Sequence, residues 1–517
     1  MKKNLIILCS FSLLLGGCTK LDEKFEGNLT DEQVGGGGSG GNVSGLLKGV
    51  YDNIRLPFQN HENIYALWEV TTDELVVPTR GPDWDDNGTW RVLHSQKWTG
   101  DHNFIRNVFN NLSGVVYGST ELLRFNPTPE QAAEARMLRA MAMFMLLDGW
   151  DQVPYREPGG SAIEAPLVRR GSEALTYIIS ELNAILPALP AGPNTRANKD
   201  AARVLLMKCY LNKGVIANRA APTFDAADMQ QVITLADQII NSNAYSFSAN
   251  YFDNFAPANT TIGKENIWVQ QNIGGVEAGE VRSRYHSSIH YNQAPGGWNG
   301  FSTLSDFYAK FEASDKRRGV AYPTGDPTRP NPGNRVNVGF LVGQQYNLTN
   351  DAILYSKDGS ATNPPLIYTP EVQLIETGSN LEVTGIRVFK YPVDWTNNAS
   401  GTVDNDYVYF RLSDVMLMKA EALLRTTGAA LALPIVNSIR ANRGATPLAA
   451  VTLDNLIDER GRELYTENWR RQDLIRFGKF LAPRQLKPDA SDAKYLLFPI
   501  PNQQLAASPN LTQNPGY

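Results

Sequence analysis

The 517-residue chain has little histidine and cysteine, with five His and three Cys. So few imidazole and thiol groups leave little material for a metal site built from these ligands. Acidic residues outnumber basic ones by 53 to 48, and the formal net charge is −5. A nucleic-acid-binding protein needs a basic surplus or a basic stripe, and we find neither. The hydrophobic content of 42% excludes an intrinsically disordered chain and predicts a large core.

The sequence has no second hydrophobic span after the apolar run at its N-terminus, from Asn4 to Leu15, which follows Lys2 and Lys3. This run is too short for a stable membrane helix and predicts a cleaved secretion signal. It ends in a segment that resembles the lipobox of bacterial lipoproteins, Leu15-Gly16-Gly17-Cys18. The alternative is an ordinary signal peptide with a chance cysteine. The pattern predicts cleavage before Cys18, acylation of its thiol, and a protein anchored to a membrane without spanning it.

The predicted processing also excludes an intramolecular disulfide bond in the mature chain. Cys9 leaves with the signal and Cys18 is acylated, so Cys209 is the one thiol of the mature chain. Cys209 lies in a run of helical character, 201–210, and is expected to be buried and unreactive. A large exported protein without disulfides must depend on its hydrophobic core.

Helix pairs recur along the chain. The clearest helix begins at Thr128, with Pro129 at its first position and Gln131 able to complete a capping box. Its apolar stripe runs to Leu147, Gly149 is expected to stop it, and the periodic run 105–122 should form an antiparallel hairpin with it. Further pairs are expected at 172–186 with 198–213 and at 409–425 with 431–443, and an isolated helix at 226–241. Such repeats suggest a tetratricopeptide-like array.

The expected fold class is therefore mainly α, a tetratricopeptide-like scaffold of helical pairs with an irregular, loop-rich lobe that contains short strands. Composition divides the chain into a signal peptide (1–17), a lipidated tether with a glycine-rich linker (18–41), an N-terminal helical region (42–242), the loop-rich lobe (243–406) and a C-terminal helical region (407–517). Long ordered loops on a rigid support are typical of binding sites.

The segment 458–478 is densely charged. Asp458 with Arg462, and Glu467 with Arg471, have the spacing of helical ion pairs. Glu459 and Glu463 resemble a pair of catalytic acids, but carboxylates one helical turn apart project from one face and leave no room for a sugar ring. We therefore expect a structural ion network in this segment.

Several segments, in order along the chain, resemble the SusD/RagB family: 139–144, 149–155, 411–422, 458–478, 498–501 and 513–517. The resemblance implies an outer-membrane lipoprotein facing the cell exterior. Such a protein captures a nutrient, usually a glycan, and hands it to a TonB-dependent transporter of the SusC type. It also implies four tetratricopeptide-like helix pairs that support an irregular binding lobe, with no catalysis and no cofactor.

Two loop clusters carry the side chains expected at a glycan. Flat aromatic faces suit the apolar side of sugar rings, and Tyr and Trp add a polar handle. In the first cluster, Trp84 stands between Asp residues in a loop rich in Gly, Pro and Asn, so it is expected to be exposed. Glycan-binding family members place Trp, Asn, Asp and Arg of this region at the ligand, which implies Trp84, Asn87, Asp73 and Arg80 here. Asp73 could instead cap a turn, and Arg80 could pair with nearby acids.

The second cluster lies in the loop-rich lobe and supplies Tyr285, Tyr291 and Trp298, the last between Gly-Gly and Asn-Gly.

Trp90 and Trp98 are expected in the core. The acidic run 83–86 with Asn87 could bind calcium, although it lacks the spacing of an EF-hand loop. No catalytic residue and no metal site are predicted.

Three functions remain open on sequence alone. The favoured one is a non-catalytic glycan-binding lipoprotein that works with a SusC-like transporter. A peptide-capturing protein or a purely structural lid of the transporter is the alternative. A secreted glycoside hydrolase would need two carboxylates across one cleft, and no loop motif demands them.

Overall fold

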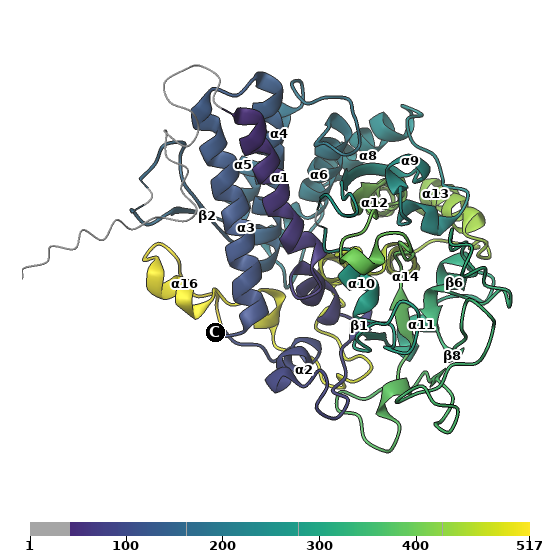
Figure 1. The fold of residues 1–517 in the computed structure, drawn as a ribbon. Coiled ribbons are helices and arrows are strands. Elements are labelled where there is room, and N and C mark those ends of the chain that lie inside the picture. The colour runs from purple at the N-terminus through teal and green to yellow at the C-terminus, as the bar shows by residue number, and fades with distance from the viewer. Residues whose placement is uncertain (1–41, 162, 278, 427) are drawn as a thin grey trace, which may run out of the picture. The chain divides into compact units, whose positions relative to one another are not determined.

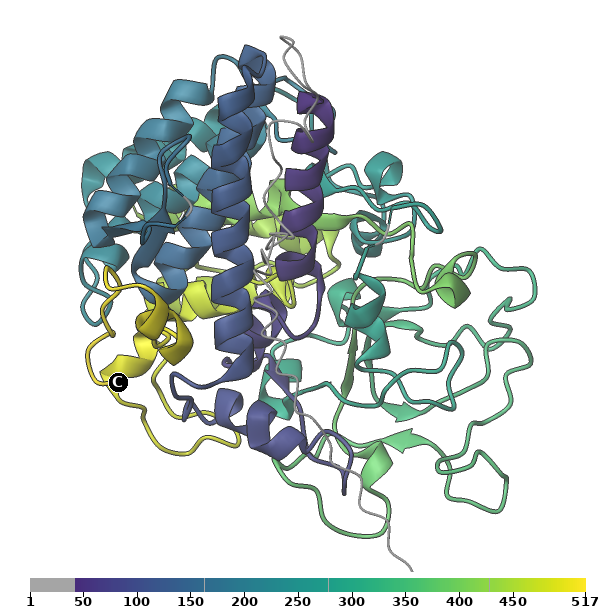
Figure 2. The ribbon, with the colours of Figure 1, turned by 60° about the vertical axis from the view of Figure 1, so that its left-hand side comes forward.

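The computed structural model describes residues 42–517 apart from positions 162, 278 and 427, so the predicted signal peptide, Cys18 and the glycine-rich linker through residue 41 lie outside the described residues. Val43–Tyr517 forms one compact unit. Long helices gather on one side of this unit and the loop-rich segment on the other, as Figures 1 and 2 both show. The helices, in chain order, are α1 (Val43–Gln59), α2 (Thr89–His94), α3 (Asn103–Leu122), α4 (Pro129–Trp150), α5 (Gly171–Ile185), α6 (Lys199–Leu211), α7 (Lys213–Ala217), α8 (Ala226–Ile240), α9 (Asn259–Ile262), α10 (Arg282–His286), α11 (Ser305–Tyr308), α12 (Leu412–Leu424), α13 (Ala429–Asn442), α14 (Leu453–Leu464), α15 (Arg470–Arg476) and α16 (Asn502–Ala507).

The strands are short and pair antiparallel. They form four two-stranded sheets and one three-stranded sheet among the described residues. The pairs are β1 (Leu75–Val76) with β5 (Ser302–Thr303), β2 (Gln152–Tyr155) with β3 (Leu167–Arg170), β4 (Asn266–Gln270) with β11 (Tyr407–Arg411), and β8 (Gly343–Gln344) with β9 (Ile367–Tyr368); the larger sheet has the order β10 (Arg387–Phe389), β7 (Val338–Leu341), β6 (Gly319–Val320). The prediction of a mainly α fold with a loop-rich region of short strands is confirmed.

Helices α3 and α4 pack side by side, as the predicted hairpin requires. The hydroxyl of Thr128 accepts from the backbone N–H of Gln131, whose side chain accepts from the N–H of Thr128, so the predicted capping box is present. The prediction that Gly149 stops α4 is wrong, because the helix continues to Trp150 and is capped by Asp151 at φ 60°. A Cβ at Gly149 would lie 3.0 Å from the Trp68 ring, so glycine serves close packing there.

Two other helix predictions need correction. The segment from Tyr407 to Arg411 is the strand β11 and not the start of a helix, which begins at Leu412. Every residue of β11 is buried, and a short apolar run buried on both faces has no period that separates strand from helix. Helix α8 is not isolated, since it packs against α6 and α12. Cys209 on α6 is buried, as expected.

The charged segment 458–478 forms two helices, α14 and α15, separated by a break at 465–469. Both predicted i, i+4 pairs are wrong. Glu467 lies in the break and not on the helix of Arg471. Asp458 and Arg462 share α14, but Asp458 bonds Lys310 instead. Arg462 bonds Glu459 instead of Asp458, and Arg471 lies 3.7 Å from Asp148. The side chain of Glu467 bonds Arg411.

The expected ion network is present and centres on Glu463. This fully buried carboxylate contacts the guanidinium groups of Arg317 at 2.9 Å, Arg411 at 2.6 Å and Arg443 at 2.8 Å. Burial alone would raise the pKa of Glu463, but these three cations hold it well below its usual range. Glu459, also buried, bonds Arg317, so both acids are structural and neither faces a cleft.

Hydropathy adds one finding on membranes. Within the part of the chain that the structure describes, no helix has both the length and the apolar character needed to cross a bilayer.

Candidate ligand-binding surface

Two tryptophans from distant parts of the chain meet at the surface. The indole N–H of Trp84 donates to the backbone carbonyl oxygen of Trp298 at 2.8 Å, across 214 positions of sequence. Trp298 is 45% exposed and Trp84 is half-buried. A Cβ at Gly300 would lie 2.4 Å from the Trp84 ring, so only glycine lets the two segments approach this closely. We call the side chains of Trp84 and Trp298 the tryptophan platform.

Other rings support the platform from below. The His61 ring lies 5.2 Å from that of Trp298, centroid to centroid. Trp90 and Phe301 each lie 5.7 Å from Trp84 and are buried. Burial, together with the charge of Arg284, lowers the pKa of His61 to about 4, so the supporting ring is uncharged near neutral pH. Trp90 and Trp98 are core residues, as predicted.

The loop that carries Trp84 has an unusual backbone. Trp84 has φ 60° and Asn87 has φ 51°, in the left-handed region that bulky residues rarely occupy. Arg80 and Asp83 bond each other's backbone at 2.9 and 3.2 Å, and the Asp86 carboxylate accepts from the indole of Trp90 at 2.8 Å. Strained conformations persist where the surroundings over-determine them, and they cluster at ligand clamps. Asn87 is exposed on this loop.

Tyr291 lies on the same loop as Trp298 and is 42% exposed. Its ring packs on that of His290, with centroids 3.8 Å apart. The carboxylate of Glu382 accepts from the Tyr291 hydroxyl and from the backbone N–H of Lys357, and lies 3.0 Å from Nε2 of His290. Burial and the bond to Glu382 raise the pKa of Tyr291, so its hydroxyl keeps its proton.

The prediction that Arg80 contacts the ligand is wrong, because its side chain is buried and bonds other loops of the protein. Only 4% of the residue is exposed. Its guanidinium reaches neither Asp83 nor Asp85 and donates to the carbonyl oxygens of Asn299 and Gly300 at 3.1 and 2.8 Å. Three further acceptors complete its shell: Leu381 O, Thr384 O and Ser302 Oγ. With its donors used inside, Arg80 ties the loop of Trp298 to the segment 381–384.

Two other expected site residues are also placed away from the platform. Tyr285 is fully buried and donates to the Asn398 side chain at 3.0 Å, so its ring cannot stack on a ligand. Both oxygens of Asp73 accept from Arg470 at 2.7 Å, and Asp73 lines a separate small cavity with Lys310. Arg470 and the other nearby cations lower the pKa of Asp73 against the opposing effect of burial.

The structure adds residues that the sequence did not single out. His61 and Glu382 hold the exposed rings, and Gly300 allows the close approach. A lone His or Glu in a polar loop carries no local signal of such a role. Among the described residues, no group of three or more His, Cys, Asp or Glu side chains is placed to hold a metal ion, and the acidic run 83–86 forms no such group.

The fold and the platform together define the class of this protein: a mainly helical protein that carries surface tryptophan rings on its loops. The sequence profile of the SusD family matches residues 264–517. The chain is 26% identical over 491 residues to the starch-binding protein SusD of Bacteroides thetaiotaomicron, covering 87% of this chain and 84% of that protein. It is 22% identical over 506 residues to a SusD-like protein of Bacteroides ovatus, covering 94% and 84% of the two chains.

Solved structures share the fold of this chain. A SusD superfamily protein from Parabacteroides distasonis superposes with a TM-score of 0.72 at 19% identity, covering 95% of this chain and 100% of that chain. Surface glycan-binding protein A from Bacteroides thetaiotaomicron, solved in complex with laminarihexaose, has a TM-score of 0.68 at 17% identity and covers 91% and 98%. The chain belongs to the SusD family.

Proposed function

We propose that the protein binds a glycan, an oligo- or polysaccharide, on the tryptophan platform and does not cleave it. The observation that carries the proposal is the pair formed by exposed Trp298 and half-buried Trp84, fixed by a hydrogen bond between distant loops. Indole faces offer flat apolar area at low entropic cost, which suits the apolar face of a sugar ring. Asn87 and Tyr291 are the polar candidates beside these faces.

Support for binding without hydrolysis comes from three of the carboxylates near the platform. A glycosidase needs an acid and a second carboxylate on opposite sides of the bond that it cleaves. Here Asp85 is paired with Arg91, Asp86 accepts from Trp90, and Glu382 holds Tyr291. These carboxylates hold the loops in place. The relatives named as starch-binding and glycan-binding proteins support the same function.

The proposal extends to a partner and a location. The lipobox at Cys18 and membership of the SusD family support an acylated protein on the outer face of the outer membrane. There it would deliver the glycan to a SusC-like TonB-dependent transporter. Purification from outer membranes in mild detergent should recover such a transporter with the wild-type protein, and Cys18→Ala should move the protein away from the membrane fraction.

Calorimetry against a panel of purified glycans, including starch and laminarin, tests the binding function. Trp298→Ala should lower the affinity for the bound glycan about twofold to tenfold, since a stacked ring contributes about 0.5–1.5 kcal/mol beyond the area that it buries. Leu431→Ala, at a 57% exposed position on α13, is the matched control and should bind as wild type. Equal binding by both variants would remove the platform from the proposal, and release of shorter sugars would contradict the absence of catalysis.

A further inference from the structure

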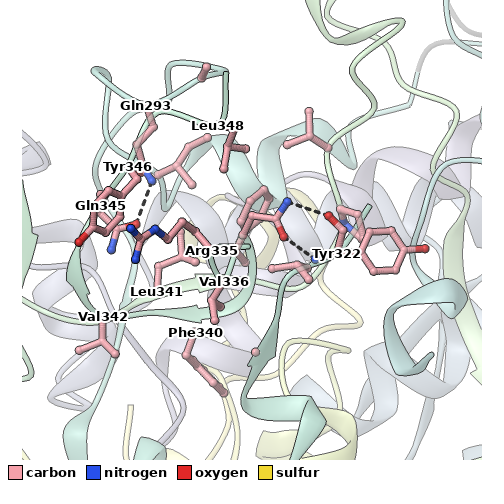
Figure 3. A pocket seen from close by; sticks show the side chains of 18 of the residues that line it. Gln293, Tyr322, Arg335, Val336, Phe340, Leu341, Val342, Gln345, Tyr346 and Leu348 are labelled. Carbon is pink, nitrogen blue, oxygen red and sulfur yellow. Dashed lines mark hydrogen bonds between the residues drawn. The ribbon is translucent and has the colours of Figure 1, made fainter. Parts of the chain in front are cut away.

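The loop-rich region contains a second cavity, shown in Figure 3, with a volume of about 430 Å³. Its floor is apolar and comes from β7 and β10, with Phe340, Leu341 and Phe389. Such a volume is within the usual range for small-molecule sites, about 300–1,000 Å³. The cavity is distinct from the tryptophan platform, because neither Trp84 nor Trp298 is among its lining residues.

One loop separates the cavity from the platform region. Asn292 and Gln293 line the cavity, whereas their neighbour Tyr291 is exposed and bonds Glu382. The side chain of Gln293 bonds that of Gln345 across the cavity wall at 3.3 Å, drawn as a dashed line in Figure 3. A ligand in the cavity and a ligand on the platform would therefore contact two parts of the same loop.

The tyrosine and tryptophan rings of the cavity are half-buried, and neighbouring polar side chains hold them in place. The Arg335 guanidinium lies 3.7 Å from the centroid of Tyr346 and is itself held by both oxygens of Asp351, at 2.8 and 3.0 Å. The hydroxyl of Tyr322 donates to Asp253 at 2.8 Å. Rings fixed before binding lose little conformational entropy when a ligand stacks on them.

Trp395 and Tyr308 complete the aromatic lining. The Arg329 guanidinium lies 4.7 Å from the centroid of Trp395. The remaining polar lining is dominated by side-chain amides: Asn292, Gln293, Asn337, Gln344, Gln345 and Asn347. Most of their hydrogen-bonding groups are used within the protein, as both groups of Asn337 bond Tyr322 and those of Gln345 bond Gly343 and Gln293. The amide nitrogens of Asn292 and Gln344 donate to backbone carbonyls, which leaves their oxygens as acceptors for a ligand hydroxyl. Aromatic faces combined with amides match the two kinds of surface that a sugar presents.

The charged side chains of the lining indicate the charge of the ligand. Among the described residues that line the cavity, arginine is the one charged type. Arg335 is neutralised by Asp351, but Arg318 has no carboxylate within ion-pair distance in the described part of the chain. Its Nε donates to the Tyr308 hydroxyl at 2.7 Å, and its guanidinium lies 4.5 Å from that ring. The remaining N–H groups of this oriented guanidinium match the two oxygens of a carboxylate.

We infer that the cavity is a second saccharide site, which takes a sugar unit carrying a carboxylate, a uronic acid, with Arg318 as the partner of the carboxylate. The inference rests on the glycan-binding function proposed above and specifies the class of glycan. A uronic acid supplies hydroxyls that the side-chain oxygens of Asn292 and Gln344 can accept from. It also supplies ring faces for Tyr346 and Trp395, and the anion that the lining lacks.

The test uses the purified protein and calorimetry with acidic trisaccharides, those of galacturonic, glucuronic, guluronic and mannuronic acid, beside uncharged maltotriose and cellotriose. At least one acidic trisaccharide should bind, and Arg318→Gln should weaken it about tenfold or more, as expected for a lost charge-assisted hydrogen bond. Added salt should lower the affinity for the acidic trisaccharide, because the Arg318 side chain that meets its carboxylate is only half-buried and is screened by ions. Arg318→Lys keeps the positive charge but loses the planar pair of N–H donors, so its affinity for acidic trisaccharides should lie between those of wild type and Arg318→Gln.

Lys316→Gln is the matched control, since it removes a positive charge two positions away on an exposed side chain that does not line the cavity. It should bind acidic trisaccharides as wild type. Trp395→Ala should weaken them even if the Arg318 variants fold poorly, and Trp298→Ala should leave them unchanged while it weakens the glycan bound on the platform. The two binding proposals can thus fail separately.

Three results with the trisaccharides would overturn the inference, and a fourth comes from a peptide control. They are no binding of any acidic trisaccharide, acidic binding that survives Arg318→Gln in a folded protein, and acidic binding abolished by Trp298→Ala, which would place the ligand on the platform. Equal binding of a triglutamate peptide would show an anion or peptide site and would also contradict a saccharide site.

Discussion

The guanidinium of Arg80 donates a hydrogen bond of 2.8 Å to the backbone carbonyl oxygen of Gly300. This bond joins the two segments that carry Trp84 and Trp298, and it lies inside the protein. The platform is therefore assembled by a buried residue that does not itself reach the ligand.

Arg80→Lys should lower glycan affinity without removing any ligand contact. Lysine keeps the charge but cannot donate to five acceptors in the fixed directions of a guanidinium, so the loop of Trp298 loosens. We expect about tenfold weaker binding and a lower melting temperature, measured by calorimetry and thermal unfolding. Unchanged affinity in a destabilised variant would show that the clamp serves stability alone.

Gly300→Ala tests the close approach beneath the platform. The new Cβ would lie 2.4 Å from the Trp84 ring, which must move and give up its bond to Trp298. Binding to the platform glycan should be largely lost. Gly49→Ala, where the space around a Cβ on α1 is open, should bind as wild type and be slightly more stable. If the Gly300 variant binds like the Gly49 variant, the position of Trp84 is not important for binding.

Glu463→Gln should destabilise the fold by about 3–5 kcal/mol, because it leaves three buried guanidinium groups without their shared carboxylate. Glu173→Gln removes an exposed acid paired with Arg169 and should cost less than about 1 kcal/mol. Urea unfolding of the two variants gives the comparison. Similar losses in both would mean that the central network contributes little.

Stability should fall as the pH rises through neutrality. Burial raises the pKa of Glu69 well above its usual range and that of Glu74 to about 7, and the two acids bond each other. At these two sites the folded protein therefore binds more protons than the unfolded chain above about pH 4.5, and the pair makes the free energy of unfolding decrease with pH by about 1.4 kcal/mol per unit for each extra proton that it holds.

Glu69→Gln should make this decline shallower. The amide keeps an acceptor for the backbone N–H of Asn468 and a donor toward Glu74, but it does not titrate. Denaturant unfolding at pH 6 and pH 9 measures the change, and the variant should gain on wild type at the higher pH. Parallel curves for the two proteins would contradict a proton shared by this pair.

Much of the helical frame could be predicted locally. The capping box at Thr128 and the period of the apolar residues after it depend on neighbours three and four positions apart. The end of β11, from Tyr409 to Arg411, was mistaken for the start of a helix because a strand buried on both faces shows no alternation. The pair of Glu467 and Arg471 was mispredicted because a break at 465–469 separates two helices that the charge spacing could not distinguish from one. The pair of Asp458 and Arg462 was mispredicted because Asp458 bonds Lys310, which is distant in the sequence.

By itself, the sequence determined the kind of protein. Its helix periods, its aromatic loops and its family motifs all follow from residues close together in the chain. Only the tertiary structure decided which aromatic rings reach the surface and what holds them. Trp84 meets Trp298 across 214 positions, and Arg80 and Tyr285 turn inward. Burial and such contacts depend on how distant segments pack, a property that no local spacing records.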